Sequence, residues 1–232
     1  TYLRSVIFNK KKINVSSSIK EITETSDIII LAIPSPFLEN ELMKIKLQLK
    51  NKIIFSALKG VVPKTHLIVS EHLNKYYKIS LDKIGIITGP CHAEEVALDK
   101  LSYLTVACKN KSIGEEMKTA LESNYIKVKF SKDTMGVEYA AMLKNVYAII
   151  AGVANGLGYG DNFQSVLISN SVREMKRFIN TIYKINRDIN DSEYLGDLLV
   201  TAYSTFSRNR NLGNMLGKGY SLKAAISEIS MI

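Results

Sequence analysis

Lys144 and Asn145 stand side by side in a long proline-free stretch of apolar and small residues. On a helix, the neighbours of Lys144 at three and four positions are alanines and a tyrosine, so the amine has no polar face to join. Burial lowers the pKa of an amine towards the range useful for proton transfer. Asn145 can donate to and accept from a hydroxyl or carbonyl oxygen. The pair predicts proton-transfer chemistry; the alternative is that Lys144 reaches solvent past the small alanines.

Two further groups of polar residues follow in the second half of the chain. Asp197 lies in the apolar helical stretch "LGDLLVT", where a buried carboxylate requires a cationic partner, and Lys144 and Lys59 are the candidates. The run Ser207, Arg208 and Asn209 combines neutral donors with a guanidinium, which matches phosphate oxygens through two parallel hydrogen bonds. It therefore predicts a phosphate site; the alternative is a basic loop.

Three loops of the first half place polar residues directly after apolar runs that read as strands. They are "PSPF" at 34–37, "SALKG" around Lys59, and "TGPCHAEEVA" around Cys91. The carboxyl ends of parallel strands share one edge of a sheet, and ligands bind at that edge. Lys59 taken alone also fits a solvent-exposed turn.

The neighbours Cys91 and His92 do not predict a metal site. One cysteine and one histidine fall short of the ligand count that zinc requires, and no second cluster has suitable spacing. His66 and His72 are expected on a helix surface. A cysteine nucleophile would need a histidine base close in space, which the sequence does not establish.

The order of the elements predicts an α/β fold followed by helices. Apolar runs at 27–34, 52–58, 84–90, 103–109 and 125–131 predict strands, the first of them covered on both faces, and they alternate with helical patterns at 37–49, 65–77 and 114–123. From about Asp133 only helical patterns follow, at 134–154, 163–183, 193–204 and 220–230. No G-x-G-x-x-G occurs, and "GLGYG" at 156–160 follows a helix and predicts a turn.

The composition is that of an ordinary globular protein. The 232 residues are 46% hydrophobic and carry a formal net charge of +9. Because the lysines are scattered, solvated faces are favoured over nucleic-acid binding, and a cleft for small anions is a third option. Two cysteines suit a reducing, cytoplasmic setting. We expect no signal peptide and no membrane insertion.

The motifs "SALKG", "GPCHAEEVA", "GVEYAAMLKNVYAI", "YLGDLLVT" and "SRNR" occur in the order in which they stand in one enzyme family. With them the whole chain closely resembles the bacterial NAD(P)-dependent glycerol-3-phosphate dehydrogenases. The resemblance implies a Rossmann-like, dinucleotide-binding domain at 1–132 and a helical substrate domain at 133–232. It also implies that the first βαβ unit, with its glycine-rich fingerprint, and the last helices are absent from this chain.

The resemblance also implies roles for individual residues. Lys144 is expected to be the proton acceptor, and Lys59 to contact substrate and cofactor. Arg208 is expected to clamp the phosphate and to lie near the cofactor. The other expected contacts are with substrate at Gly89, Cys91, Asn145, Asp197, Ser207 and Asn209, and with cofactor at Phe37 and Ala93. Cys91 departs from the family, since many members have serine there.

The sequence therefore predicts an oxidoreductase that interconverts sn-glycerol 3-phosphate and dihydroxyacetone phosphate and supplies glycerol phosphate for phospholipids. The cofactor is NAD or NADP, and the oligomeric state is left open, with a homodimer as one option. One alternative is another two-domain dehydrogenase that acts on a hydroxy acid or sugar acid. The other is a non-catalytic protein that binds a phosphometabolite or nucleic acid.

Overall fold

The structure, a computed structural model, describes residues 11–230 and divides into two compact units. The sheet unit holds the described residues up to Ile87 together with Ala93–Thr134. The helical unit holds Thr88–His92 and the described residues from Met135 onward. The short segment Thr88–His92 thus belongs with the helices, although it begins at the last residue of a strand of the sheet.

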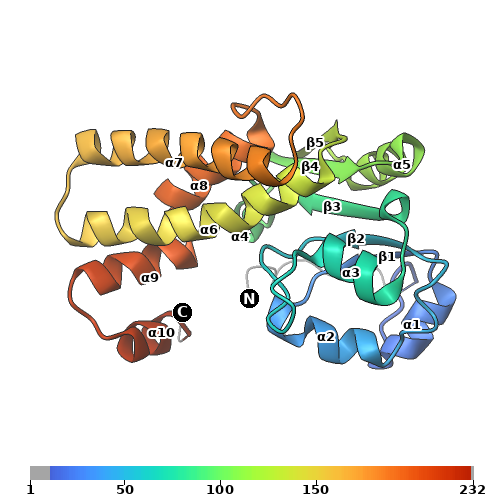
Figure 1. Cartoon of the computed structure of the whole chain (residues 1–232). Helices are drawn as coiled ribbons and strands as arrows, with labels where there is room; N and C mark the ends of the chain where they lie inside the picture. Colours follow the sequence, from blue (N-terminus) through green and yellow to red (C-terminus); the bar gives the residue numbers. More distant parts are fainter. Residues whose placement is uncertain (1–10, 231–232) are drawn as a thin grey trace. The chain divides into compact units, whose positions relative to one another are not determined.

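The sheet unit is built on a five-stranded sheet in which the strands follow one another in sequence order (Figure 1). Its strands are β1 (Ile28–Leu31), β2 (Ile53–Ser56), β3 (Ile84–Thr88), β4 (Ser102–Cys108) and β5 (Ile126–Ser131). The pairs β1–β2, β2–β3 and β4–β5 are parallel. All five strands lie where the apolar runs predict them.

Helices cover both faces of this sheet. The helices of this unit are α1 (Ile19–Thr25), α2 (Ser35–Met43), α3 (Val69–Tyr77), the 3-10 turn η1 (Leu81–Lys83), α4 (Ala93–Val96) and α5 (Lys111–Leu121). The consecutive residues Ile54 and Phe55 of β2 point to opposite faces. Ile54 packs in a core with residues of α2 and α3, whereas Phe55 packs in a second core with Met117 of α5.

Two expectations about this unit are wrong. The first strand was expected to be covered on both faces, but β1 is the outermost strand within residues 11–230 and its Ile30 is 45% exposed. His72 was expected on a helix surface, but it is buried in α3 and its Nδ1 lies 3.1 Å from the hydroxyl of Thr65. His66 lies in a turn before that helix, with a positive φ of 54°.

The helical unit begins with two long helices and continues with shorter ones. In chain order they are α6 (Thr134–Gly156), α7 (Asp161–Ile182), a π-helical turn η2 (Ser192–Gly196), α8 (Asp197–Tyr203), α9 (Arg208–Gly217) and α10 (Leu222–Ser230). The expected turn at 156–160 is present, with Gly158 at a φ of +85°. Helix α6 is long and apolar enough to cross a membrane by length and composition alone, yet 56% of its most apolar window is buried inside the protein, as in a core helix.

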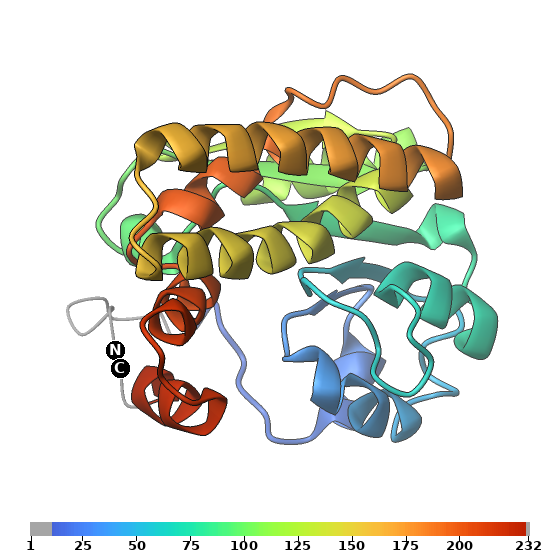
Figure 2. The ribbon, with the colours of Figure 1, turned by 60° about the vertical axis from the view of Figure 1, so that its left-hand side comes forward.

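Helix α9 packs on α6 through glycines that repeat every four residues on both helices. Gly152 and Gly156 of α6 face Gly213 and Gly217 of α9, and the Cα atoms of Gly156 and Gly217 would each be 3.0 Å from a Cβ added to the other. Figures 1 and 2 show α9 running beside α6, on the side away from α7. Only glycine permits backbones to approach this closely, so these residues fix where α9 lies.

We therefore expect Gly213→Ala to destabilise the helical unit. The added Cβ would lie 2.0 Å from the carbonyl oxygen of Ile149, and a helical backbone cannot move aside as a flexible side chain can. Overpacking of this kind costs about 1–3 kcal/mol or more in the free energy of unfolding, measured by urea denaturation. Gly160→Ala is the matched control, since a Cβ there meets nothing within 4 Å. Equal losses in both variants would contradict a glycine-dependent crossing.

Candidate functional site

Lys144 and Asp197 form a buried ion pair in the helical unit. Lys144, on α6, is 3% exposed, and Asp197, the first residue of α8, is 1% exposed. The Nζ of Lys144 donates a hydrogen bond to Oδ1 of Asp197. The hydroxyl of Thr88 donates to Oδ2 of the same carboxylate at 3.1 Å. The expected cationic partner of Asp197 is thus confirmed as Lys144, and the alternative that Lys144 reaches solvent is wrong.

Tyr147, on the same helix as Lys144, is also buried. Burial raises the pKa of the Tyr147 phenol, three residues beyond Lys144, to about 12, with a smaller contribution from the carboxylate of Glu174. Among the described residues the Tyr147 hydroxyl has no hydrogen-bond partner. Burial disfavours the charged form of an amine, whereas contact with a carboxylate favours it. The contact with Asp197 therefore stabilises the buried ammonium of Lys144.

The run Ser207–Asn209 begins a helix, so the alternative of a basic loop is wrong. Ser207 is the N-cap of α9, and its hydroxyl accepts a hydrogen bond from the backbone N–H of Arg210 at 3.3 Å. A serine before a helical segment is a recognised start signal, which the sequence contained. Arg208 is exposed in the first turn of α9, at the positive end of the helix dipole, where an anion is stabilised.

The glycine crossing brings the start of α9 towards the residues next to Lys144. Gly213 faces Ile149, and Gly217 faces Val153, so the two helices run in the same direction. Continuing this register by one turn towards the N-termini brings Asn209 level with Asn145. The amide beside the buried amine and the start of α9 therefore belong to one region of the helical unit.

The segment Thr88–His92 enters the helical unit through a conformation that requires glycine. Gly89 has a φ of +123°, which side chains rarely adopt. Cys91 is partly buried and forms no disulfide. The ring of His92 lies 6.3 Å from that of Phe206, and its buried Nε2 has no hydrogen-bond partner among the described residues. A ligand oxygen that reached this nitrogen would satisfy it.

Over residues 11–230 no three histidine, cysteine or acidic side chains come together as a metal site would require. Sequence reasoning missed Thr88 and the buried nitrogen of His92. The sequence signal for Thr88 was a hydroxyl at the end of the otherwise apolar strand "IGIIT". No pattern in a single sequence reveals which ring nitrogen is buried.

The remaining candidates lie in the sheet unit. A cavity of about 430 Å³ opens at the carboxyl ends of β1 and β2 and is lined by residues 32–36 and 57–59. Lys59 is on its wall, whereas Phe37 lies in the first turn of α2 and is 60% exposed. Ala93 is exposed at the start of α4. Two of the three predicted loops thus meet at one edge of the sheet, as parallel strands require.

The family of the chain follows from its match to known proteins. A family model described as NAD-dependent glycerol-3-phosphate dehydrogenase C-terminus matches residues 133–232, and the N-terminus model matches residues 1–114. The glycerol-3-phosphate dehydrogenase [NAD(P)+] 2 of Lactobacillus delbrueckii subsp. bulgaricus is 33% identical over 95% of this chain and 67% of its own length. The chain belongs to the NAD-dependent glycerol-3-phosphate dehydrogenase family.

Other family members agree with this assignment. The phytoplasma enzyme (Aster yellows witches'-broom, strain AYWB) is 38% identical over 92% of this chain and 64% of its own length. The crystal structure of glycerol-3-phosphate dehydrogenase from Coxiella burnetii superposes with a TM-score of 0.84 at 26% identity, over 91% of this chain and 65% of that one. The predicted fold class, an α/β sheet followed by helices, is thereby confirmed. The chain spans about two thirds of the length of these relatives, for example 66% of the Exiguobacterium enzyme.

The buried ion pair gives a direct test of stability. Asp197→Ala would leave the Lys144 ammonium buried beside no carboxylate, and we expect a loss of about 3–5 kcal/mol in the free energy of unfolding. The double variant Lys144→Met with Asp197→Leu removes both charges and should cost much less. Glu41→Ala, which breaks the exposed pair with Lys44 (2.7 Å), is the control and should cost at most about 1 kcal/mol. If Asp197→Ala lost no more free energy of unfolding than the double variant, that result would contradict the burial of the pair.

Proposed function

We propose that this chain forms the catalytic part of an oxidoreductase that interconverts sn-glycerol 3-phosphate and dihydroxyacetone phosphate. The observation that carries the proposal is the buried ion pair of Lys144 and Asp197 in a chain of this family. An amine that is withdrawn from water and held by a carboxylate is suited to move one proton at a defined oxygen. The family match supports this function over a hydroxy-acid dehydrogenase or a non-catalytic binding protein.

A nicotinamide cofactor would bind at the sheet unit. The cavity at the carboxyl ends of β1 and β2 supports this, because ligands of open α/β sheets bind outside the carboxyl ends of the strands. Phe37, Lys59, Ala93 and Arg208 are the residues that would contact NAD or NADP. When bound, the nicotinamide accepts or supplies the hydride that is exchanged with C2 of the substrate.

The protein's own residues would bind the substrate and move its proton. In the oxidation direction, Nζ of neutral Lys144 takes the proton of the C2 hydroxyl, and in reduction the Lys144 ammonium returns it to the C2 oxygen. Asp197, anchored by Thr88, holds this ammonium in place. Lys59 and Asn145 polarise the same oxygen. Arg208, with Ser207 and Asn209, binds the phosphate, while Gly89 and Cys91 contact the substrate through their loop.

The wider assignments belong to the same proposal. Residues 1–132 form the dinucleotide-binding domain and 133–232 the substrate domain. The enzyme works in the cytoplasm on a small phosphorylated substrate and supplies glycerol phosphate for phospholipid synthesis; its oligomeric state is left open, with a homodimer as one option. Size-exclusion chromatography with light scattering on the natural full-length protein tests that option, and a monomeric mass would exclude it.

Removing the Lys144 amine should abolish proton transfer. In the natural full-length enzyme we expect Lys144→Ala and Lys144→Arg each to lower kcat by at least about 100-fold, with smaller changes in KM. Arginine stays protonated at all working pH values, so Lys144→Arg keeps a charge beside Asp197 but cannot accept a proton. Steady-state kinetics and circular dichroism separate loss of catalysis from loss of folding. A folded Lys144→Arg enzyme with near wild-type turnover would refute the role of Lys144.

Replacing Arg208 should weaken phosphate binding even when the charge is kept. Lysine offers a point charge instead of two parallel donors. Arg208→Lys should therefore lower kcat/KM by a factor that corresponds to a loss of about 2–4 kcal/mol in transition-state stabilisation. Because phosphate binding also positions the carbon that exchanges hydride, both KM and kcat should change.

Dihydroxyacetone, which lacks the phosphate, provides the control for this variant. Added inorganic phosphite should activate its reduction by the wild type and should activate the Arg208 variant much less. Equal activation of both enzymes would show that the phosphate binds to a different cation. Arg210 is the first candidate, because it follows in the same turn of α9.

A further inference from the structure

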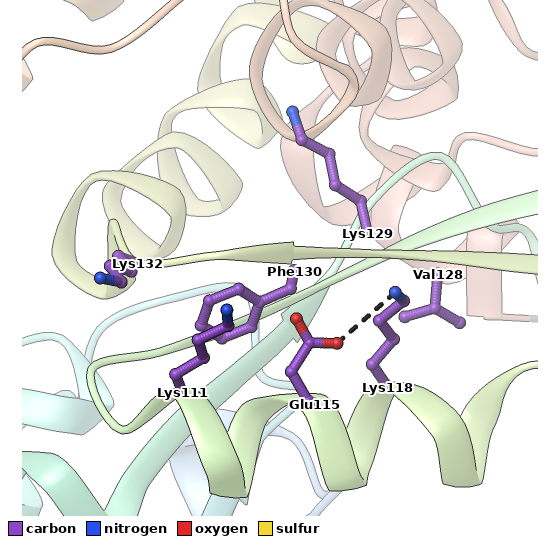
Figure 3. A pocket seen from close by; sticks show the side chains of 7 residues that line it. All are labelled: Lys111, Glu115, Lys118, Val128, Lys129, Phe130 and Lys132. Atoms are coloured by element: carbon purple, nitrogen blue, oxygen red, sulfur yellow. Dashed lines mark ion pairs between the residues drawn. The ribbon is translucent and has the colours of Figure 1, made fainter.

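A second group of cations surrounds a pocket in the sheet unit, between α5 and β5 (Figure 3). The pocket has a volume of about 720 Å³. Four lysines line it, Lys111, Lys118, Lys129 and Lys132, with Glu115 as the one carboxylate on its wall. This charge excess is not used by the proposed reaction, because every residue of the pocket lies outside the sites considered above.

The carboxylate of Glu115 balances one of these lysines. Its Oε2 lies 3.5 Å from Nζ of Lys118. Lys129 points to the opposite side of the strand from α5 in Figure 3. Lys111, Lys118 and Lys132 therefore line the pocket with the single carboxylate of Glu115 on its wall. Some exposed lysines of this unit do lie beside an acid, as Lys64 does with Glu39 at 3.3 Å.

The position of Lys111 adds to the positive potential. Lys111 is the first residue of α5, and the first turn of this helix contains no acidic residue. The N-terminus of a helix carries a partial positive charge, so a lysine there is placed against the usual preference. Asn110 caps the helix through Ile113 N at 3.3 Å, which leaves further backbone N–H groups of the first turn to be satisfied. An anion in the pocket would neutralise the lysines and the helix end together.

The floor of the pocket is apolar. Val128 is buried, and Phe130 is half-buried, with its ring so close to Gly114 that a Cβ there would lie 2.3 Å from it. The volume is in the range of sites for small organic molecules, about 300–1,000 Å³. Protection of an edge strand from aggregation explains lysines on β5 but not a lysine on α5. The combination is that of a binding site for a small anion with an apolar part.

We propose that this pocket binds a small phosphorylated molecule, with its phosphate groups on Lys111, Lys118 and Lys132 and its apolar part on Phe130. The pocket belongs to the sheet unit, whereas the proposed phosphate contact Arg208 belongs to the helical unit. Its occupancy is therefore independent of the substrate assignment. A failure of this proposal leaves the proposed reaction untouched, and a failure of the reaction leaves this pocket untouched.

Lysine acetylation read by mass spectrometry tests the proposal, with inorganic pyrophosphate as the probe and the ionic strength held constant. Pyrophosphate at twice its dissociation constant should slow acetylation of Lys111, Lys118 and Lys132 by about threefold, as mass action requires. The exposed lysines Lys12 and Lys100 should not change. The double variant Lys111→Gln with Lys132→Gln should lose the protection of Lys118, and the charge-matched variant Lys12→Gln with Lys100→Gln should keep it.

Two results would overturn the proposal. Equal protection of all lysines would show a general effect of the anion and no site. Stronger protection by a single-stranded oligonucleotide than by pyrophosphate, lost steeply with added salt, would identify a nucleic-acid surface instead.

Discussion

The helical unit depends on burying two opposite charges together. Lys144 and Asp197 lie on different helices, 53 positions apart in the chain, and each is nearly inaccessible to water. Neither charge is tolerable there alone, because an unpaired buried ion costs several kcal/mol. Two polar contacts therefore converge on Asp197, from Lys144 and from Thr88, and the second ties the end of β3 to the start of α8.

The close approach of α6 and α9 serves the same arrangement. The glycines of α6 lie two and three turns beyond Lys144, and those of α9 lie one and two turns beyond Arg208. A larger residue at any of them would push the two backbones apart. The start of α9, with its serine cap and its arginine, is thus fixed relative to the buried amine by contacts that carry no chemistry themselves.

Much of this was accessible from the sequence. Short apolar runs predicted all five strands, and the loss of that pattern after about Asp133 predicted the helical unit. The position of Asp197 inside an apolar helical stretch predicted that it would pair with a lysine. Helix α9 was missed because five polar residues in a row, at 207–211, hide a helix that packs on α6 through glycines. The exposure of Ile30 and the burial of His72 could not be predicted, since both depend on which elements lie beside them. The roles of individual site residues stay predictions.

The most direct test of the buried amine as the proton-transfer group is a crystal structure of the natural full-length enzyme with sn-glycerol 3-phosphate and oxidised cofactor. Nζ of Lys144 should lie within hydrogen-bond reach of the substrate C2 oxygen, about 2.6–3.2 Å or through one water, while Asp197 still contacts the amine. A substrate bound with its C2 oxygen out of reach of Lys144, and beside a different base, would contradict this assignment.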